Sequence, residues 1–228
     1  MVTSQLPLNL EYRPALSGED FLLAPNNQEA IAWLDKWPDW PTTGLIIYGP
    51  AGSGKTHLAQ VFLAQTRGRY IEPEELIQET AYNLVSAPAC IIEDADTVIN
   101  DTTHEEVLFH LYNALGETNC RLLLTARTPA AQWKIALPDL RSRLNAAATV
   151  AIGAPDDTLI TALLVKQFAD RQLQVDENLI SYLVPRMERS FNAVQRVVDA
   201  ADKAALAGQQ KITKPLLGNV LRDMDTQS

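Results

Sequence analysis

The spacing of apolar positions divides the chain into a first part that alternates strands with helices and a second part that is helical. Before Pro155, apolar runs typical of buried strands are separated by helical patterns, and these runs occupy residues 44–48, 69–72, 89–93, 121–125 and 148–152. One further helix is predicted at residues 29–37, ahead of Pro38. This alternation predicts an α/β fold whose parallel sheet is covered on both faces and binds its ligand at the carboxyl ends of the strands.

After Pro155 the strand signal disappears and only helical spacing remains. Helices are predicted there at residues 157–170, 176–187, 190–207 and 213–222. We therefore expect an N-terminal segment at residues 1–12, an α/β domain at 13–154 and a small all-helical domain at 155–228.

The net charge of the chain and its lack of a targeting signal limit the kinds of binding partner that we expect. The chain has 19 Lys and Arg against 28 Asp and Glu, which gives a formal net charge of -9. Non-specific electrostatic binding to DNA is therefore not expected. A nucleotide or a protein partner fits this charge better. Neither a signal peptide nor an apolar run of transmembrane length is present, and Cys90 and Cys120 lie in or beside predicted interior strands. These features predict a reduced, cytoplasmic protein with no membrane partner.

The most specific motif follows the first strand and opens a helical pattern. It fits the phosphate-loop pattern Gly-x4-Gly-Lys-[Ser/Thr] and consists of Gly49, Pro50, Ala51, Gly52, Ser53, Gly54, Lys55 and Thr56. Glycines allow the backbone N–H groups to approach an anion closely at the helix N-terminus. Lys55 would reach the β- and γ-phosphates and Thr56 would bind Mg²⁺, so ATP or ADP with Mg²⁺ is the predicted ligand. The alternative is a glycine-rich turn beside an ordinary lysine.

Polar residues end the next two long strands. Glu93 and Asp94 follow a buried strand, an arrangement that holds Mg²⁺ and polarises an attacking water, although acidic residues there are also common loop starts. Spacing leaves open which carboxylate faces the metal and which the water. Thr125 ends the following strand, where a hydroxyl could orient water beside a γ-phosphate or close the strand without any role in chemistry.

Two arginines, Arg141 and Arg143, occupy a short helical pattern after that strand. Residues two positions apart on a helix point in different directions, so one arginine can serve its own subunit while the other projects toward a neighbour's phosphate. The alternative is a solvated helix face.

The order of these motifs resembles that of the AAA+ ATPases, and more narrowly the bacterial replication initiator DnaA and its relatives. Residues 54–58, 140–144 and 150–152 are similar to the corresponding DnaA boxes, and the likeness covers about residues 18–222. It implies a nucleotide-binding AAA+ domain followed by a helical lid. DnaA continues into a helix-turn-helix DNA-binding domain that does not follow here, so the chain resembles the Hda family of DnaA-related regulators, and sequence-specific DNA binding is not expected.

The N-terminus is similar to the short peptide with which this family binds the β sliding clamp of DNA polymerase III. The residues that carry the likeness are Gln5, Leu6, Leu8 and Leu10, with the leucines alternating onto one face around Pro7. An edge strand or a tail packed on the domain is the alternative. The resemblance implies a regulator that, bound to the clamp, stimulates ATP hydrolysis by DnaA through Arg143 as an arginine finger, a group worth roughly 10³ to 10⁵ in rate in other NTPases.

Two positions depart from the family pattern. Glu93 stands where DnaA carries an aspartate, one methylene longer at a position expected to serve Mg²⁺. Asn192 aligns with the arginine of the lid that senses the bound phosphates, and an amide cannot supply a cation. Arg189 or Arg196 could take over that role, or both could be surface charges. Weak intrinsic hydrolysis is therefore expected.

The sequence leaves alternative roles for several other residues. Phe21 and Leu22 fall where relatives wrap the adenine, or they pack in the core, and His57 either contacts the nucleotide or has a structural role at the helix start. Two other functions are compatible with the sequence, a self-sufficient remodelling ATPase or helicase-loader-like chaperone, and a non-hydrolysing clamp adaptor. A homodimer is one of the assemblies that the sequence leaves open.

Overall fold

The computed structural model describes residues 12–13, 21–99 and 102–225 of the chain. These residues form two compact units, one spanning Arg13–Gly153 and the other containing the helices that follow Ala154. Within the described part of the chain, no helix is long and apolar enough to cross a membrane.

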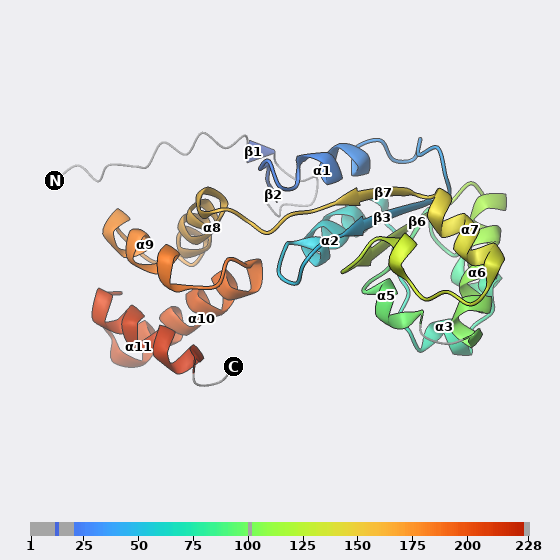
Figure 1. Cartoon of the computed structure of the whole chain (residues 1–228). Coiled ribbons are helices and arrows are strands. Elements are labelled where there is room, and N and C mark those ends of the chain that lie inside the picture. The colour runs from blue at the N-terminus through green and yellow to red at the C-terminus, as the bar shows by residue number, and fades with distance from the viewer. Residues whose placement is uncertain (1–11, 14–20, 100–101, 226–228) are drawn as a thin grey trace. The chain divides into compact units, whose positions relative to one another are not determined.

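The first unit is built on a five-stranded parallel sheet with the order β4-β5-β6-β3-β7 (Figure 1). The strands are β3 (Gly44–Tyr48), β4 (Arg69–Tyr70), β5 (Ala89–Ile92), β6 (Arg121–Ala126) and β7 (Ala148–Ala151). β6 lies between β5 and β3, so Ile47 pairs with Thr125 and Ile92 with Leu124. The carboxyl ends of β3, β5 and β6 therefore meet at one edge. A separate two-stranded sheet joins β1 (Tyr12–Arg13) and β2 (Phe21–Leu22).

Both faces of the large sheet are buried because successive strand side chains point to opposite sides. On one face Leu45 and Ile47 pack with Phe62, in a layer formed by α1 (Gln28–Leu34) and α2 (Lys55–Thr66). On the other face Ile46 packs under α3 (Glu75–Gln78), α4 (Ala81–Leu84), α5 (Ala95–Val98), α6 (Thr102–Glu117) and α7 (Pro138–Ala146), with the short 3₁₀ turn η1 (Ala130–Gln132). Each large side chain buried this way contributes about 1.5–3 kcal/mol to the fold.

The second unit is a bundle of helices whose starts are fixed by side-chain caps. It contains α8 (Asp157–Asp170), α9 (Glu177–Leu183), η2 (Val184–Arg186), α10 (Phe191–Gly208) and α11 (Lys214–Asp225). Asp156, Asp176 and Ser190 each accept a hydrogen bond from the backbone N–H three residues further on, which satisfies a free donor of the first turn. α10 packs against both α8 and α11, and Phe168 is fully buried in this unit.

The α/β sheet and the helical lid agree with the fold predicted from the sequence, with small differences at the ends of elements. The predicted helix at 29–37 ends at Leu34, and the remaining residues form turns before Pro38. The predicted helix at 176–187 ends at Leu183 and tightens into η2. Pro185 explains this change, because it lacks the N–H that an α-helix would use.

Candidate functional site

The phosphate-loop motif forms the connection from β3 to α2. Gly52 and Gly54 have φ of 70° and 99°, in the left-handed region that favours glycine. Gly54 is the N-cap of α2 and no side chain caps it, so the N–H groups of the first turn remain available to an anion. Gly49 is required for another reason, since a Cβ there would lie 2.1 Å from the carbonyl oxygen of Ile152, the residue that follows β7.

Lys55 is buried in this loop, with 8% of its surface exposed. Its Nζ donates hydrogen bonds to the carbonyl oxygens of Gly49 at 2.8 Å and Pro50 at 2.9 Å. Burial lowers the pKa of Lys55, and the nearby Asp94 carboxylate is the strongest influence that opposes the shift. The loop thus holds a desolvated cation beside uncapped N–H groups, an arrangement suited to phosphate.

The acidic pair at the end of β5 is held by the neighbouring strand. Asp94 has φ of 45°, a strained conformation for a non-glycine residue, and its N–H donates to Thr125 Oγ1 at 3.1 Å. Thr125 is 1% exposed, so its hydroxyl is committed to this contact inside the protein. Thr125 therefore fixes the turn that carries Asp94, a role that the sequence alone did not indicate.

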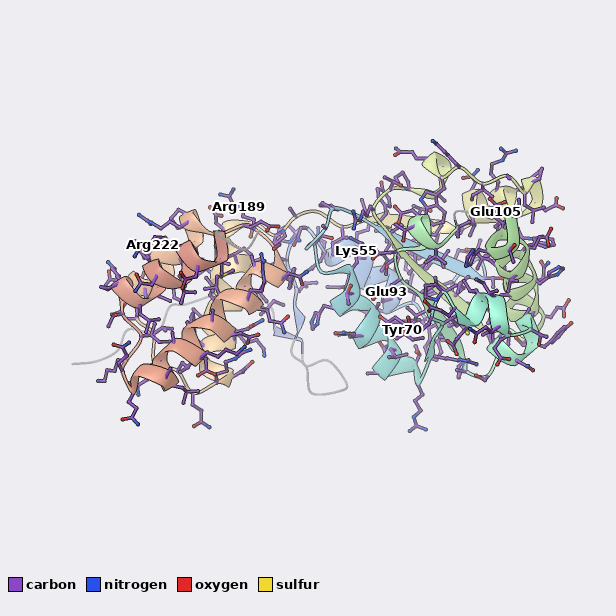
Figure 2. The ribbon with its side chains drawn as sticks, turned by 90° about the horizontal axis from the view of Figure 1, so that it is seen from below. Lys55, Tyr70, Glu93, Glu105, Arg189 and Arg222 are labelled. Atoms are coloured by element: carbon purple, nitrogen blue, oxygen red, sulfur yellow. The ribbon has the colours of Figure 1, made fainter. Side chains whose placement is uncertain are left out.

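Glu93 and Asp94 have different environments, because Glu93 is half-buried and Asp94 is exposed. Burial raises the pKa of the Glu93 carboxyl, while the Thr56 and Tyr70 hydroxyls favour its charged form. Figure 2 shows Lys55, Glu93 and Tyr70 in the same part of the unit. The Glu93 carboxylate and the Tyr70 hydroxyl interact electrostatically. Within the described residues, however, Glu93 Oε1 and Tyr70 Oη are both buried without a hydrogen-bond partner.

Buried polar atoms without a hydrogen-bond partner lie around the phosphate loop, and they indicate whether the loop fits a nucleotide with a bound metal ion. Glu93 Oε1 and Ser53 Oγ are both buried without a partner in the part of the chain that is described, and such groups are costly unless a ligand or water completes them. Both belong to the motifs around the loop. Oxygen ligands from Thr56 and Glu93 have the chemistry that Mg²⁺ prefers. The residues present therefore fit a nucleotide with its metal ion.

Two residues of this region were missed by the sequence analysis. Tyr70 ends β4, next to β5, and burial together with the Glu93 carboxylate raises the pKa of its hydroxyl. Asp96 lies two residues beyond the acidic pair, and its Oδ2 accepts a hydrogen bond from the N–H of Arg127 at 2.9 Å. The sequence feature that could have identified Tyr70 and Asp96 is their position, because both residues lie at or just beyond the carboxyl ends of strands.

Arg143 lies on α7 at the opposite end of β3 from the phosphate loop. Its guanidinium carbon is 5.2 Å from the ring centre of Phe109 and 6.0 Å from that of Tyr112, and the side chain is exposed. The Tyr112 ring contacts Gly44, the first residue of β3, whereas the loop follows the last residue of that strand. Four residue steps of a strand span roughly 13 Å, so Arg143 lies away from the loop of its own chain.

The remaining predicted residues are distributed over both units. Ala51 is exposed in the loop, and His57 is half-buried in the first turn of α2. Leu22 ends β2, where its carbonyl oxygen accepts a hydrogen bond from Asn27 Nδ2 at 3.0 Å, and Phe21 precedes it in the same strand. Gln5, Leu6, Leu8 and Leu10 lie outside the described residues.

In the helical unit, Asn192 is the second residue of α10. The two nearby arginines are engaged with carboxylates. Arg189 Nε is 2.5 Å from Asp157 Oδ1, and Arg196 Nη2 is 3.9 Å from Glu188 Oε2. Both pairs are exposed, which makes each worth little to stability.

Each of the two units matches a family of known proteins. Residues 13–151 match the family model for the bacterial DnaA ATPase domain, and residues 156–221 match the model for the Hda lid domain. An uncharacterised protein of Haemophilus influenzae is 26% identical over 231 residues, which covers 96% of this chain and 99% of that protein.

Solved structures of low identity share the fold. Domain III of the Thermotoga maritima replication initiation protein DnaA aligns with a TM-score of 0.77 and 18% identity, covering 89% of this chain and 94% of that one. AMPPCP-bound DnaA from Aquifex aeolicus aligns with a TM-score of 0.70 and 17% identity, covering 82% of this chain and 65% of that one.

Proposed function

The chain belongs to the DnaA-related family of AAA+ ATPases, and we propose that it is a regulator of replication initiation that stimulates ATP hydrolysis by DnaA. In this proposal it binds adenine nucleotide and the β sliding clamp and converts DnaA to its inactive ADP form. The match of residues 156–221 to the Hda lid supports a regulator over an initiator.

The observation that carries the proposal is the position of Arg143. It is an exposed guanidinium that rests on two aromatic rings and forms no ion pair among the residues described. Because it lies at the far end of β3 from its own phosphate loop, its charge is separated from the nucleotide site of its own chain. A cation presented this way suits the transition-state charge of a neighbouring molecule's γ-phosphate.

The chain's own nucleotide would act as a binding element. Lys55 and the N–H groups of the loop would hold the phosphates, and Thr56 and Glu93 would hold Mg²⁺, which neutralises phosphate charge when bound. Asn192 supplies no cation at the position of the lid arginine, and Arg189 is engaged with Asp157. These features support weak turnover by this protein and activation of a partner's hydrolysis.

The proposed clamp contact involves Gln5, Leu6, Leu8 and Leu10, a segment that is separate in sequence from the phosphate loop and from Arg143. The clamp would bring the regulator to the DNA on which DnaA acts, so that the two proteins meet at a high effective concentration.

The test is ATP hydrolysis by purified DnaA with and without this protein, in the presence and absence of clamp loaded on DNA. We expect hydrolysis to rise only when the protein and the loaded clamp are both present. An unchanged rate in the complete mixture would contradict the proposal.

A self-sufficient remodelling ATPase is the second candidate, and the acidic pair beside the phosphate loop favours it. Steady-state turnover by the isolated protein separates the two. Rapid hydrolysis without DnaA would support the second candidate, and turnover far below that of the stimulated DnaA mixture would support the first.

A further inference from the structure

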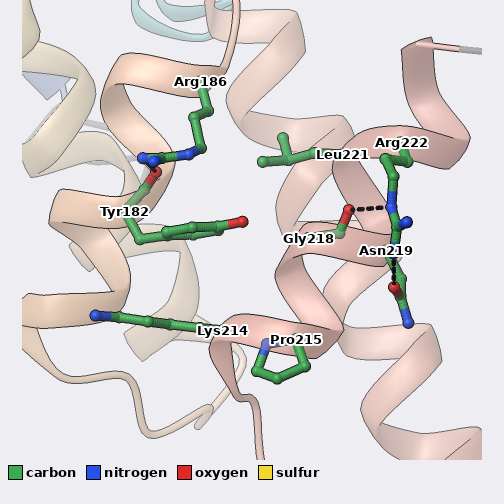
Figure 3. Close-up of a pocket in the computed structure, with 8 residues that line it drawn as sticks. All are labelled: Tyr182, Arg186, Lys214, Pro215, Gly218, Asn219, Leu221 and Arg222. Carbon is green, nitrogen blue, oxygen red and sulfur yellow. Dashed lines mark hydrogen bonds between the residues drawn. The ribbon is translucent and has the colours of Figure 1, made fainter.

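A basic pocket lies between α9 and α11 of the helical unit (Figure 3). Its volume is about 590 Å³, and its walls include Tyr182 and Arg186 on one side and Lys214, Leu221 and Arg222 on the other. None of the described residues that line it is Asp or Glu. Three cations thus line one hollow, and no carboxylate is among the residues of its wall.

The charges of Arg186 and Lys214 are not compensated. Within the described part of the chain neither forms an ion pair, in contrast to Arg171 and Arg189 of the same unit, which both pair with aspartates. Arg186 is oriented by its own turn, because Nη1 donates to the Tyr182 carbonyl oxygen at 2.9 Å and the guanidinium lies 4.3 Å from the Tyr182 ring centre. Its charge is therefore fixed in place yet available to a ligand.

The second wall adds to the positive potential. Lys214 begins α11, a helix of 12 residues, so the partial positive charge of the helix N-terminus lies on the same side as the Lys214 ammonium. Arg222 is oriented further along α11 by hydrogen bonds from Nε to the Gly218 carbonyl oxygen at 3.3 Å and from Nη2 to Asn219 Oδ1. A Cβ at Gly218 would lie 3.0 Å from Tyr182 Oη, so glycine allows α11 to approach α9 here.

The pocket also has apolar surface at Pro215 and Leu221, which distinguishes it from a patch of charge alone. An aliphatic side chain can be desolvated against these residues while carboxylates meet the cations. A ligand that matches both features carries two or three acidic groups next to an apolar anchor.

The distribution of charge favours a short acidic peptide over a nucleic acid. The chain has a net charge of -9, and the residues after Gly153, with 9 Lys and Arg against 10 Asp and Glu, contribute only -1 of it. An extended polyanion that reached beyond the pocket would be repelled by the net negative charge of the rest of the chain, whereas a short segment can contact the pocket's cations alone. One face of the Tyr182 ring is covered by Arg186, which removes that face as a platform for stacking a base.

From these observations we propose that the pocket between α9 and α11 docks a short acidic, aliphatic segment of a partner protein. The carboxylates of that segment contact Arg186, Lys214 and Arg222, and an aliphatic side chain packs on Leu221. The site lies wholly within the helical unit and does not depend on the regulatory function proposed above.

The test measures binding of a fluorescein-labelled peptide of alternating Asp and Leu to the full chain by fluorescence anisotropy. We expect the double variant Arg186→Glu, Lys214→Glu to bind about tenfold more weakly than the wild type, because two attractions become repulsions. The neutral variant Arg186→Gln, Lys214→Gln should fall between them. The matched control is Lys203→Glu with Lys211→Glu, which makes the same charge change at exposed lysines outside the pocket and should stay within about twofold of wild type.

Two further probes identify the class of ligand. A peptide with Lys in place of Asp should not bind, and oligothymidine should bind no more tightly to the wild type than to the Arg186, Lys214 variant. The proposal is overturned if the acidic peptide fails to bind, if the control variant loses as much affinity as the pocket variant, or if oligothymidine binding is what the pocket variant loses.

Discussion

At the scale of single residues, the phosphate loop combines a buried cation with backbone donors, and Lys55 is the residue that most directly tests it. Lys55→Ala should weaken ATP binding by about 1.5–3 kcal/mol, or roughly ten- to a hundredfold, because a charge-assisted contact to phosphate is lost. Titration with a fluorescent ATP analogue measures this, with the exposed Lys36→Ala as control. Equal affinities for the Lys55 variant and the wild type would remove the loop from the nucleotide site.

The two cysteines differ in environment and should differ in reactivity. Cys90 is fully buried in β5, and burial raises the pKa of its thiol to about 12, whereas Cys120 is half-buried. A thiol reagent near pH 8 should label Cys120 in the folded protein and Cys90 only after unfolding. Equal labelling rates for the Cys90→Ala and Cys120→Ala variants would contradict this assignment.

The burial of Cys90 should also make the free energy of unfolding depend on pH. The thiol of Cys90 has a folded pKa above the ordinary value of 9.0, so between pH 9.0 and about 12 the unfolded state loses a proton that the folded state keeps. This group therefore reduces the free energy of unfolding as the pH rises through that window. Cys90→Ala should show a smaller alkaline loss of stability in urea unfolding than Cys120→Ala.

At the scale of elements, α7 is positioned by a buried carboxylate on α6. Glu105, labelled in Figure 2, is 3% exposed. Its two oxygens accept hydrogen bonds from the N–H groups of Ala136 at 2.9 Å and Leu137 at 2.6 Å. These residues immediately precede α7, the helix that carries Arg143. Glu105 thus links the arginine helix to the core of the unit.

Removing this carboxylate should be costly. Glu105→Ala leaves two backbone donors without a partner and should lower the free energy of unfolding by about 3 kcal/mol, measured by urea unfolding. The neighbouring Glu106 is exposed, and Glu106→Ala should change stability by no more than about 0.5 kcal/mol. Similar losses for the two variants would show that the buried contact does not anchor α7.

Most of the elements could be predicted because their signals are local. The strand at Gly44–Tyr48 has the predicted bounds, as does the helix at Asp157–Asp170, since apolar spacing and an Asp cap lie within a few residues of each other. The phosphate loop was visible for the same reason. The contact of Thr125 with Asp94 depends on β6 lying beside β5, and Glu105 meets its two partners 31 and 32 residues further on. Such pairings are set by the order of strands and packing of helices, which local spacing does not specify.

At the scale of the whole molecule, the proposed clamp-binding segment and the phosphate loop lie in separate parts of the chain. The variant Gln5→Ala with Leu8→Ala should lose binding to the β sliding clamp in a pull-down while its affinity for ATP stays unchanged, because the phosphate loop is untouched. The matched control is Gln65→Ala with Leu206→Ala, which alters the same residue types elsewhere in the chain and should leave clamp binding intact. Recovery of the clamp with the N-terminal variant would refute this assignment.

We propose that Arg143 acts on the nucleotide of DnaA rather than on that of its own chain. The direct measurement is the rate of DnaA ATP hydrolysis with DNA-loaded clamp, comparing wild type, Arg143→Ala and the matched control Arg141→Ala, an exposed arginine on the same helix. We predict that Arg143→Ala keeps its fold and its affinity for ATP but loses stimulation, while Arg141→Ala retains it. Full stimulation by the Arg143→Ala variant would show that Arg143 is not the arginine that acts on DnaA.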